Sequence, residues 1–217
     1  MDSQCSPFVS VIIPAKNASK WLGLCLNAIV NQSYPKEHIE ILVIDNGSTD
    51  NTIQIAQSYG TTVIEKPELK LGALRNCGTD IAKGTAFAFI DSDVVICQDW
   101  IVSALSCLDS DDDIGCVGAF PSPPLSNWVT KSWQYLQIPR ISPEESELKW
   151  LPSMNIVVSK TTFVEVGGFN THLLTCEDVD FCYRLRAKAK ISYCNGMKAC
   201  HYGEATSLKE LFLKERW

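Results

Sequence analysis

Residues 85–93 have the sequence Thr-Ala-Phe-Ala-Phe-Ile-Asp-Ser-Asp, a short apolar run that ends in two acidic residues. An apolar run without polar alternation is typical of a strand that is buried on both faces. Asp91 and Asp93 would stand at the carboxyl end of that strand, near enough to share one divalent cation. An acidic loop before the next helix explains the same residues, because Asp is also common in turns.

Similar runs precede and follow this one along the chain. Strand-like runs lie at 9–13, 40–44, 61–64, about 114–119 and 154–158, and helical patterns lie at about 18–32, 50–58, 72–82 and 177–188. This alternation predicts an α/β protein with a Rossmann-like, three-layer α/β/α fold and a mostly parallel central sheet. Ligands of such sheets bind at the carboxyl ends of the strands, so the residues that follow each strand are the first candidates for a site.

The composition is that of an ordinary globular domain. The chain has 217 residues, of which 46% are apolar and 20% are charged. A net charge of −6 and a pI near 5.1 argue against a nucleic-acid partner, which needs a basic surface. No apolar run reaches the roughly 20 residues that a transmembrane helix needs. The chain starts at Met1 without an apolar signal segment, so we expect a cytoplasmic protein whose ten cysteines are small core residues.

Five short segments stand out as candidates for chemistry. In chain order they are Pro14-Ala15-Lys16-Asn17, Asp45-Asn46-Gly47-Ser48-Thr49-Asp50, Gly72-Ala73-Leu74-Arg75-Asn76-Cys77-Gly78, Asp91-Ser92-Asp93 and Glu177-Asp178. Each segment alone is a weak signal, and turn-forming residues explain several of them. As an ordered set within about residues 8–203, they resemble the family 2 glycosyltransferases.

The resemblance implies a GT-A fold, a nucleotide-diphosphate sugar as donor, a divalent cation (Mn²⁺ or Mg²⁺) and inversion at the anomeric carbon. The residues that it implies for binding the nucleotide and its phosphates are Pro14, Ala15, Asn17, Asp45, Gly72, Arg75, Asn76, Asp91 and Ser92. Asp45 would hold the base, since a carboxylate accepts the ring N–H of uracil or guanine, although a structural turn explains this residue equally well. Asp93 would be the main metal ligand, with Asp91 and His201 beside it.

By the same resemblance, Asp178 is the general base that removes the proton of the acceptor hydroxyl. The structural alternative is that Glu177 and Asp178 cap a helix and complement its dipole. His201 has a structural alternative too, as a hydrogen-bonded or surface histidine beside Tyr202.

We expect one catalytic domain over residues 1–217, with a nucleotide-binding half at about 8–119, an acceptor half at about 120–203 and a C-terminal helix at 204–217. The acceptor would be a glycan, a lipid or a precursor of a cell-surface polysaccharide. The aromatic residues that either stack on its sugar or fill the core are Trp128, Trp133, Tyr135 and Trp150.

Residues 207–217 form an amphipathic helical pattern. Such a helix either packs on the domain or lies on the inner face of a membrane as a peripheral contact. Leu213 stands where processive relatives carry the Gln of a Gln-x-x-Arg-Trp motif, so processive synthesis is not expected. Because the pattern stops abruptly at Trp217, we expect the helix to be truncated and the chain to be a piece of a longer protein.

Two other functions fit part of the sequence. A sugar nucleotidyltransferase would share the fold and the metal, but it usually carries a glycine-rich loop after the first strand, and residues 14–17 contain no glycine. A non-catalytic nucleotide-binding module is the second alternative. The presence of both Asp93 and Asp178 weighs against it, because binding alone has no chemical need for either.

Overall fold

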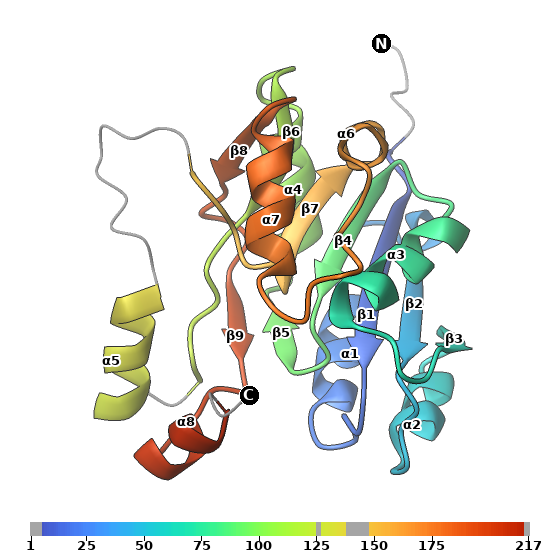
Figure 1. Ribbon diagram of the computed structural model, residues 1–217. Coiled ribbons are helices and arrows are strands. Elements are labelled where there is room, and N and C mark those ends of the chain that lie inside the picture. The colour runs from blue at the N-terminus through green and yellow to red at the C-terminus, as the bar shows by residue number, and fades with distance from the viewer. Residues whose placement is uncertain (1–5, 125–126, 138–147, 215–217) are drawn as a thin grey trace.

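The computed structural model describes residues 6–124, 127–137 and 148–214. Its strands are β1 (Val9–Ala15), β2 (Ile39–Asp45), β3 (Thr62–Glu65), β4 (Ala86–Ile90), β5 (Val94–Ile96), β6 (Ile114–Gly118), β7 (Asn155–Ser159), β8 (Lys190–Tyr193) and β9 (Ala199–His201). Its helices are α1 (Leu22–Val30), the 3₁₀ helix η1 (Lys36–His38), α2 (Thr52–Ser58), α3 (Leu71–Ile81), α4 (Trp100–Leu108), α5 (Trp128–Gln137), α6 (Lys160–Val166), α7 (Glu177–Leu185) and α8 (Leu208–Lys214). Figure 1 shows their arrangement.

The described strands form a seven-stranded sheet in the order β3-β2-β1-β4-β7-β6-β8, and β5 pairs with β9 in a small second sheet. The large sheet is mostly parallel, as predicted: β1 runs parallel to β2 and β4, and β3 is parallel to β2. β7 is antiparallel to both of its neighbours, β4 and β6. The parallel strands end at one edge, where Ala15 lies opposite Asp45 in register. Strands from both predicted halves share this sheet, and the division of function between the halves stays a prediction.

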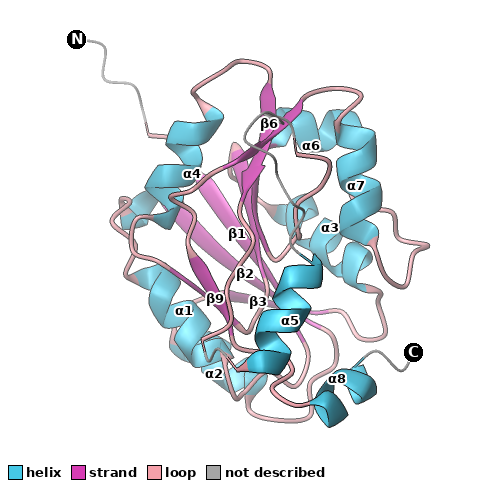
Figure 2. Cartoon of the chain, turned by 90° about the vertical axis from the view of Figure 1, so that its left-hand side faces the viewer, coloured by secondary structure: helices cyan, strands magenta, loops and turns pink. Residues whose placement is uncertain are grey.

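Helices cover both faces of the sheet, with α1, α2 and α4 on one side and α3, α6 and α7 on the other (Figure 2). The alternating side chains of β1 explain why two cores form. Val11 and Ile13 pack in one core with Leu22 of α1. Ile12, which points to the opposite face, packs in the other core with Phe181 of α7. The predicted three-layer α/β/α fold is confirmed.

Several of these elements were not predicted from the sequence. β5, β8 and β9 are only three or four residues long, too short for an alternating pattern to be recognised. α4 and α5 contain Ser, Thr, aromatic and β-branched residues, which weaken a helical signal. The pairing of β5 with β9 affects the site, because it sets Val94 opposite His201.

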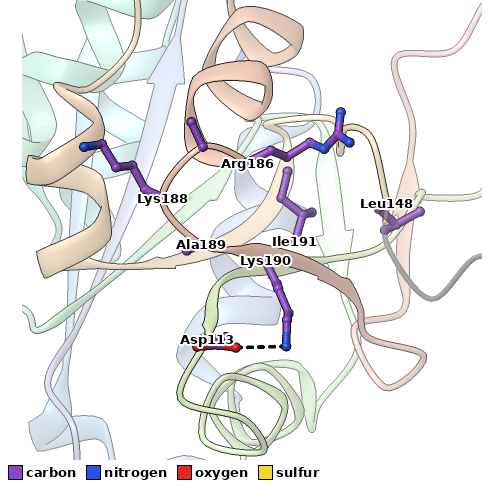
Figure 3. Close-up of a pocket in the computed structure, with 8 residues that line it drawn as sticks. Asp113, Leu148, Arg186, Lys188, Ala189, Lys190 and Ile191 are labelled. Atoms are coloured by element: carbon purple, nitrogen blue, oxygen red, sulfur yellow. Dashed lines mark ion pairs between the residues drawn. The ribbon is translucent and has the colours of Figure 1, made fainter.

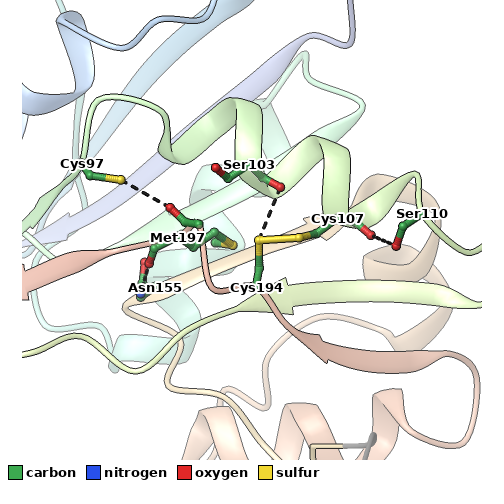
Figure 4. Close-up of a disulfide and its surroundings, with 8 residues drawn as sticks. Cys97, Ser103, Cys107, Ser110, Asn155, Cys194 and Met197 are labelled. Atoms are coloured by element: carbon green, nitrogen blue, oxygen red, sulfur yellow. Dashed lines mark hydrogen bonds between the residues drawn. A yellow bond between two sulfur atoms is a disulfide. The ribbon is translucent and has the colours of Figure 1, made fainter.

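The expectation that the cysteines are free, small core residues is wrong in two respects, because Cys176 is exposed and two other cysteines are joined in a disulfide. Cys25 and Cys116 are buried and free, as expected, but Cys107 at the end of α4 forms a disulfide with Cys194 after β8 (Figure 4). The fold brings their Cα atoms to 6.3 Å, within the range that a disulfide spans. Because 87 residues separate the two cysteines in the sequence, no local pattern predicts this pairing. The cytoplasmic location stays a prediction.

The C-terminal helix α8 is shorter than predicted within the described part of the chain, and the positions after Lys214 lie outside it. Its Leu208 and Phe212 side chains are exposed. None of the helices in the described ranges is long and apolar enough to cross a membrane. The predicted peripheral membrane contact stays a prediction.

Candidate active site

The loops after β1 and β2 are joined by hydrogen bonds. Asn17 has a positive φ of 49°, and its side-chain oxygen accepts a bond from the Thr49 N–H at 2.9 Å. The Asn17 N–H in turn donates to the Ser48 hydroxyl at 2.9 Å, and the Ser19 N–H donates to Asp50 at 3.1 Å. Pro14 and Ala15 are buried at the end of β1 and lead into this paired loop. The predicted nucleotide-lining segments therefore lie together, while their ligand stays a prediction.

Asp45, the last residue of β2, is fully buried. Its Oδ2 accepts hydrogen bonds from the Gly47 and Ser48 N–H groups, each at 2.9 Å. Its Oδ1 is buried and has no hydrogen-bond partner among the described residues. A buried acceptor without a donor is costly, so this oxygen is suited to a donor that a ligand brings, such as the ring N–H of a base.

α3 contributes two features to the site: a close backbone approach at Gly72 and the side-chain amide of Asn76, which both donates and accepts a hydrogen bond. A Cβ at Gly72 would lie 3.1 Å from the Asn170 carbonyl and 3.5 Å from the Glu177 Cβ, so glycine lets α3 approach the segment before α7. Asn76 donates to the Phe169 carbonyl at 2.8 Å and accepts from the Phe169 N–H at 2.9 Å. Both ends of this amide support the turn before Phe169, and its predicted place beside the nucleotide stays a prediction.

Arg75 lies between two acidic residues. Its Nη2 is 2.8 Å from Asp91 Oδ1, and its Nη1 is 2.7 Å from Glu177 Oε1. The side chain is 1% exposed. Burial alone would lower the pKa of the guanidinium, but the two carboxylates outweigh burial and raise the pKa. The family resemblance predicts Arg75 beside the phosphates, and this bridge could not be predicted, since the two partners are 16 and 102 residues away in the sequence.

Asp93 and His201 form the second charged contact. The β5–β9 pairing brings His201 Nε2 to 3.3 Å from Asp93 Oδ2, and His201 Nδ1 lies 2.9 Å from Glu204 Oε1. Burial would lower the pKa of His201, but the hydrogen bonds to Asp93 and Glu204 raise it to about 9. Ser92 is half-buried between Asp91 and Asp93.

The described residues offer only a partial set of ligands for the predicted cation. The described part of the chain contains no group of three or more His, Cys, Asp or Glu side chains arranged to hold a metal ion. Asp91, the predicted further ligand, is paired with Arg75. A carboxylate and an imidazole remain, and a cation that binds nucleotide phosphates commonly takes few protein ligands and completes its shell with phosphate oxygens and water. Asp93 and His201 fit such a partial set.

Glycine at position 203 keeps the backbone close to this pair. A Cβ there would run into Asp93 Oδ2 and would lie 2.9 Å from His201 Nε2. Gly203 was not predicted as a site residue, because its close approach to Asp93 depends on how the turn after β9 folds. Figure 1 shows β5 and β9 side by side, with α7 in front of the large sheet.

Glu177 and Asp178 open α7 directly after Cys176, which has a positive φ of 60°. Glu177 is buried and bound to Arg75, whereas Asp178 is half-buried. Burial, and secondarily the charge of Glu177, raise the pKa of Asp178, although the Val179 and Ser153 N–H groups act in the opposite direction. A carboxylate with a raised pKa is a stronger base, so of the two acids Asp178 is the one suited to proton removal.

A cavity of about 930 Å³ lies beside this region, with Trp21, Tyr202, Gly203 and Glu204 among its lining residues. The Trp21 and Tyr202 rings pack 4.9 Å apart. A second pocket, of about 290 Å³, lies around Arg186 and the Asp113–Lys190 ion pair and contains none of the predicted site residues (Figure 3).

The aromatic residues proposed to contact the acceptor differ in their packing and exposure. Trp150 packs edge-on against Phe120, with ring centroids 5.4 Å apart. Trp128 is 66% exposed. The side chains of Trp133 and Tyr135 lie outside the described part of the structure. Their predicted contact with an acceptor stays a prediction.

With this geometry in place, the chain was compared with known proteins. The model of the family described as "Glycosyl transferase family 2" matches residues 10–170. The chain belongs to glycosyl transferase family 2. It is 32% identical over 204 residues to glycosyltransferase AglE of Haloferax volcanii, a match that covers 90% of this chain and 67% of AglE. It is 27% identical to an uncharacterized glycosyltransferase of Rickettsia felis, covering 97% of this chain and 35% of that protein.

Two solved structures have the same fold. Mannosyltransferase PcManGT from Pyrobaculum calidifontis, in complex with GDP-Man and Mn²⁺, matches with a TM-score of 0.77 and 18% identity, over 94% of this chain and 59% of that one. Residues 1–349 of S. aureus TarS match with a TM-score of 0.73 and 23% identity, over 94% and 62%. The chain thus spans between about one third and two thirds of these proteins. The predicted family, transferase class and GT-A fold are confirmed.

Proposed function

We propose that this chain transfers a sugar from a nucleotide-diphosphate donor to an acceptor hydroxyl, in a metal-dependent reaction that inverts the anomeric carbon. The observation that carries the proposal is the 3.3 Å contact between Asp93 and His201, two predicted cation ligands from distant parts of the chain. Asp93 follows β4, which lies beside β1 in the sheet, and Tyr202, the neighbour of His201, packs against Trp21 in the segment after β1.

The donor side is supported by Asp45. Its unpartnered, buried Oδ1 offers an acceptor to the ring N–H of uracil or guanine. PcManGT was solved with GDP-Man and a TarS structure with UDP-GlcNAc, so relatives of this fold bind donors with either base. Both bases are therefore tested below.

The chemistry is divided between the Asp93–His201 contact and Asp178. A divalent cation bound by Asp93 and His201 would supply positive charge for the departing diphosphate. Asp178 removes the proton of the acceptor hydroxyl. At the same time the acceptor oxygen forms a bond to the anomeric carbon, and the bond from that carbon to the diphosphate breaks. Attack from the side opposite the diphosphate inverts the centre. The cavity beside Gly203 is the proposed place for the acceptor, with a glycan, a lipid or a precursor of a cell-surface polysaccharide as its class.

Thermal melting with nucleotides tests the donor site. UDP, GDP, CDP and dTDP are added with and without Mn²⁺, since a ligand of the folded state raises the melting temperature. We expect one diphosphate to stabilise the chain strongly only with Mn²⁺, and Asp93→Asn to remove the metal-dependent part. Asp80→Asn, on the exposed side of α3, is the control that keeps it. Equal stabilisation of the Asp93→Asn variant would overturn the metal assignment.

Turnover tests the reaction. The sugar nucleotide with the stabilising base is incubated with Mn²⁺ and a panel of glycan and lipid acceptors, and the anomeric configuration of the product is read by NMR. A product of opposite configuration supports inversion, and retained configuration contradicts it. Absence of both transfer and donor hydrolysis would favour the non-catalytic module, and release of pyrophosphate from a nucleoside triphosphate would favour the nucleotidyltransferase.

A further inference from the structure

Arg75 connects three elements that the proposed reaction needs in fixed positions. It stands on α3, Asp91 follows β4, and Glu177 is the first residue of α7. Its two terminal nitrogens each reach one carboxylate, at 2.8 Å and 2.7 Å. The acidic loop that carries Asp93 and the helix that carries Asp178 are therefore tied to one guanidinium.

The bridge is almost sealed from solvent. The side chains of Arg75 and Glu177 are 1% and 9% exposed, and Asp91 is 21% exposed. Ser153, which is also buried, places its hydroxyl 3.5 Å from the same Glu177 oxygen that Arg75 binds. Both terminal nitrogens of Arg75 are already occupied by protein carboxylates. This arrangement favours an internal bridge over a direct contact with phosphate.

A buried bridge of this kind adds little net stability to the fold. Removing two charges from water costs free energy that their attraction repays only in part, and an apolar substitute of similar volume is often as stable. Its use lies in geometry, because a planar guanidinium fixes the directions of both partners. The neighbouring Gly72 is consistent with this, since the absence of a Cβ allows α3 to lie against Glu177.

We propose that Arg75 is a positioning residue, which holds the Asp93 loop and the Asp178 helix in register through Asp91 and Glu177. The inference rests on the proposed function. It assigns the two members of the Glu177-Asp178 pair to different tasks: Glu177 anchors the helix, and Asp178 is left for the acceptor. Lysine cannot replace the arginine, since a single ammonium group lacks the fork that reaches both carboxylates.

The chain offers a matched control on α7, the helix that begins with Glu177. Arg184 lies 2.7 Å from Asp180, but this ion pair joins residues one turn apart, and both side chains are about 30% exposed (31% and 29%). Arg184→Lys changes the same chemical group as Arg75→Lys, but it lies on α7 and does not touch the bridge. Any effect of Arg75→Lys on turnover should be judged against this variant.

The experiment measures donor hydrolysis or transfer with GDP-Man and UDP-GlcNAc in the presence of Mn²⁺, using native chain, Arg75→Lys, Glu177→Gln and Arg184→Lys. We expect Arg75→Lys and Glu177→Gln to lower kcat about 10- to 100-fold, the loss that a displacement of about 1 Å produces. We expect the KM for the donor and the metal-dependent shift in melting temperature to stay within about twofold of native. Arg184→Lys should retain native kcat.

Three outcomes overturn the proposal while leaving the proposed function intact. One is a kcat of Arg75→Lys no lower than that of Arg184→Lys. Another is a donor KM that rises tenfold or more at unchanged kcat, which would make Arg75 a direct ligand of the donor. The third applies if Arg75→Lys does not fold, as shown by the lack of a cooperative melt. Glu177→Gln is then the deciding variant, and a native kcat in that variant overturns the positioning role of the bridge. An inactive native chain overturns both proposals together.

Discussion

The two sides of the candidate site are built by different forces. The loops after β1 and β2 are joined mainly by hydrogen bonds in which backbone N–H groups donate to Ser, Asn and Asp side chains. The loops around β4, α7 and β9 are joined by charge, through Arg75 and His201. We call these the hydrogen-bonded side and the charged side.

The difference matches the tasks proposed for the two sides. A nucleotide base is neutral and needs a shaped surface with a few donors and acceptors, which the hydrogen-bonded side provides at Asp45. A diphosphate and a proton transfer involve full charges, which the charged side can stabilise because its groups are already paired and oriented. Substitutions on the charged side should therefore affect turnover or metal binding, and those on the hydrogen-bonded side should affect the affinity for the nucleotide base.

The largest effect is expected for Asp178→Asn. Loss of a general base lowers kcat by about 10² to 10⁴, while nucleotide binding on the other side should stay intact. The native pH profile sharpens this assignment. Because burial raises the pKa of Asp178 above its ordinary value of 3.8, kcat should fall on acidification at a higher pH than for an ordinary aspartate. Steady-state kinetics against pH measures both effects. A variant that keeps native kcat would remove Asp178 from the mechanism.

The hydrogen-bonded side was largely visible in the sequence. Its residues follow two parallel strands at short spacing, so the α/β pattern already placed residues 14–17 and Asp45 at one edge. On the charged side, the strand pattern alone indicated Asp91 and Asp93, whereas Arg75, Asp178 and His201 were identified only through the family resemblance. The contacts of this side join Arg75 to Glu177 and Asp93 to His201, and pairings over such distances leave no periodic signal.

The same reason explains the other misses. Gly203 is informative only once the turn after β9 is known to pass Asp93. The sequence around Cys107 and Cys194 does not indicate a disulfide, and their pairing needs α4 and the segment after β8 to be placed first. Local chemistry was predictable, whereas partners brought together by tertiary structure were not.

An intermediate effect is expected for Gly203→Ala on the charged side. The added Cβ would collide with Asp93 Oδ2, so the carboxylate must turn away from His201. Displacing a metal ligand in this way should weaken Mn²⁺ about 10- to 100-fold, the range found when the surroundings of a ligand are altered. Isothermal titration with Mn²⁺ and the stabilising diphosphate measures it. Gly23→Ala in α1 is the control, since the nearest atoms to its Cβ lie at 3.9 Å. Equal Mn²⁺ affinity in both variants would contradict the ligand role of Asp93.

The smallest effect is expected for Asp45→Asn on the hydrogen-bonded side. The amide oxygen can still accept from the Gly47 and Ser48 N–H groups, but the NH₂ replaces the buried Oδ1 and cannot accept from a base. Loss of one hydrogen bond of about 1.4 kcal/mol should weaken binding of the diphosphate about tenfold at unchanged kcat.

Asp50→Asn in the same loop is the control. The hydrogen bonds of Asp50, first from Ser19 and then from Thr52, lower its pKa to about 2, so its carboxylate stabilises the fold above the ordinary pKa of 3.8 and this contribution is lost as the pH falls toward 2. Asp50→Asn should thus alter acid stability and leave nucleotide affinity unchanged. A tenfold loss of affinity in both variants would mean that the loop as a whole, and not the open oxygen of Asp45, holds the base.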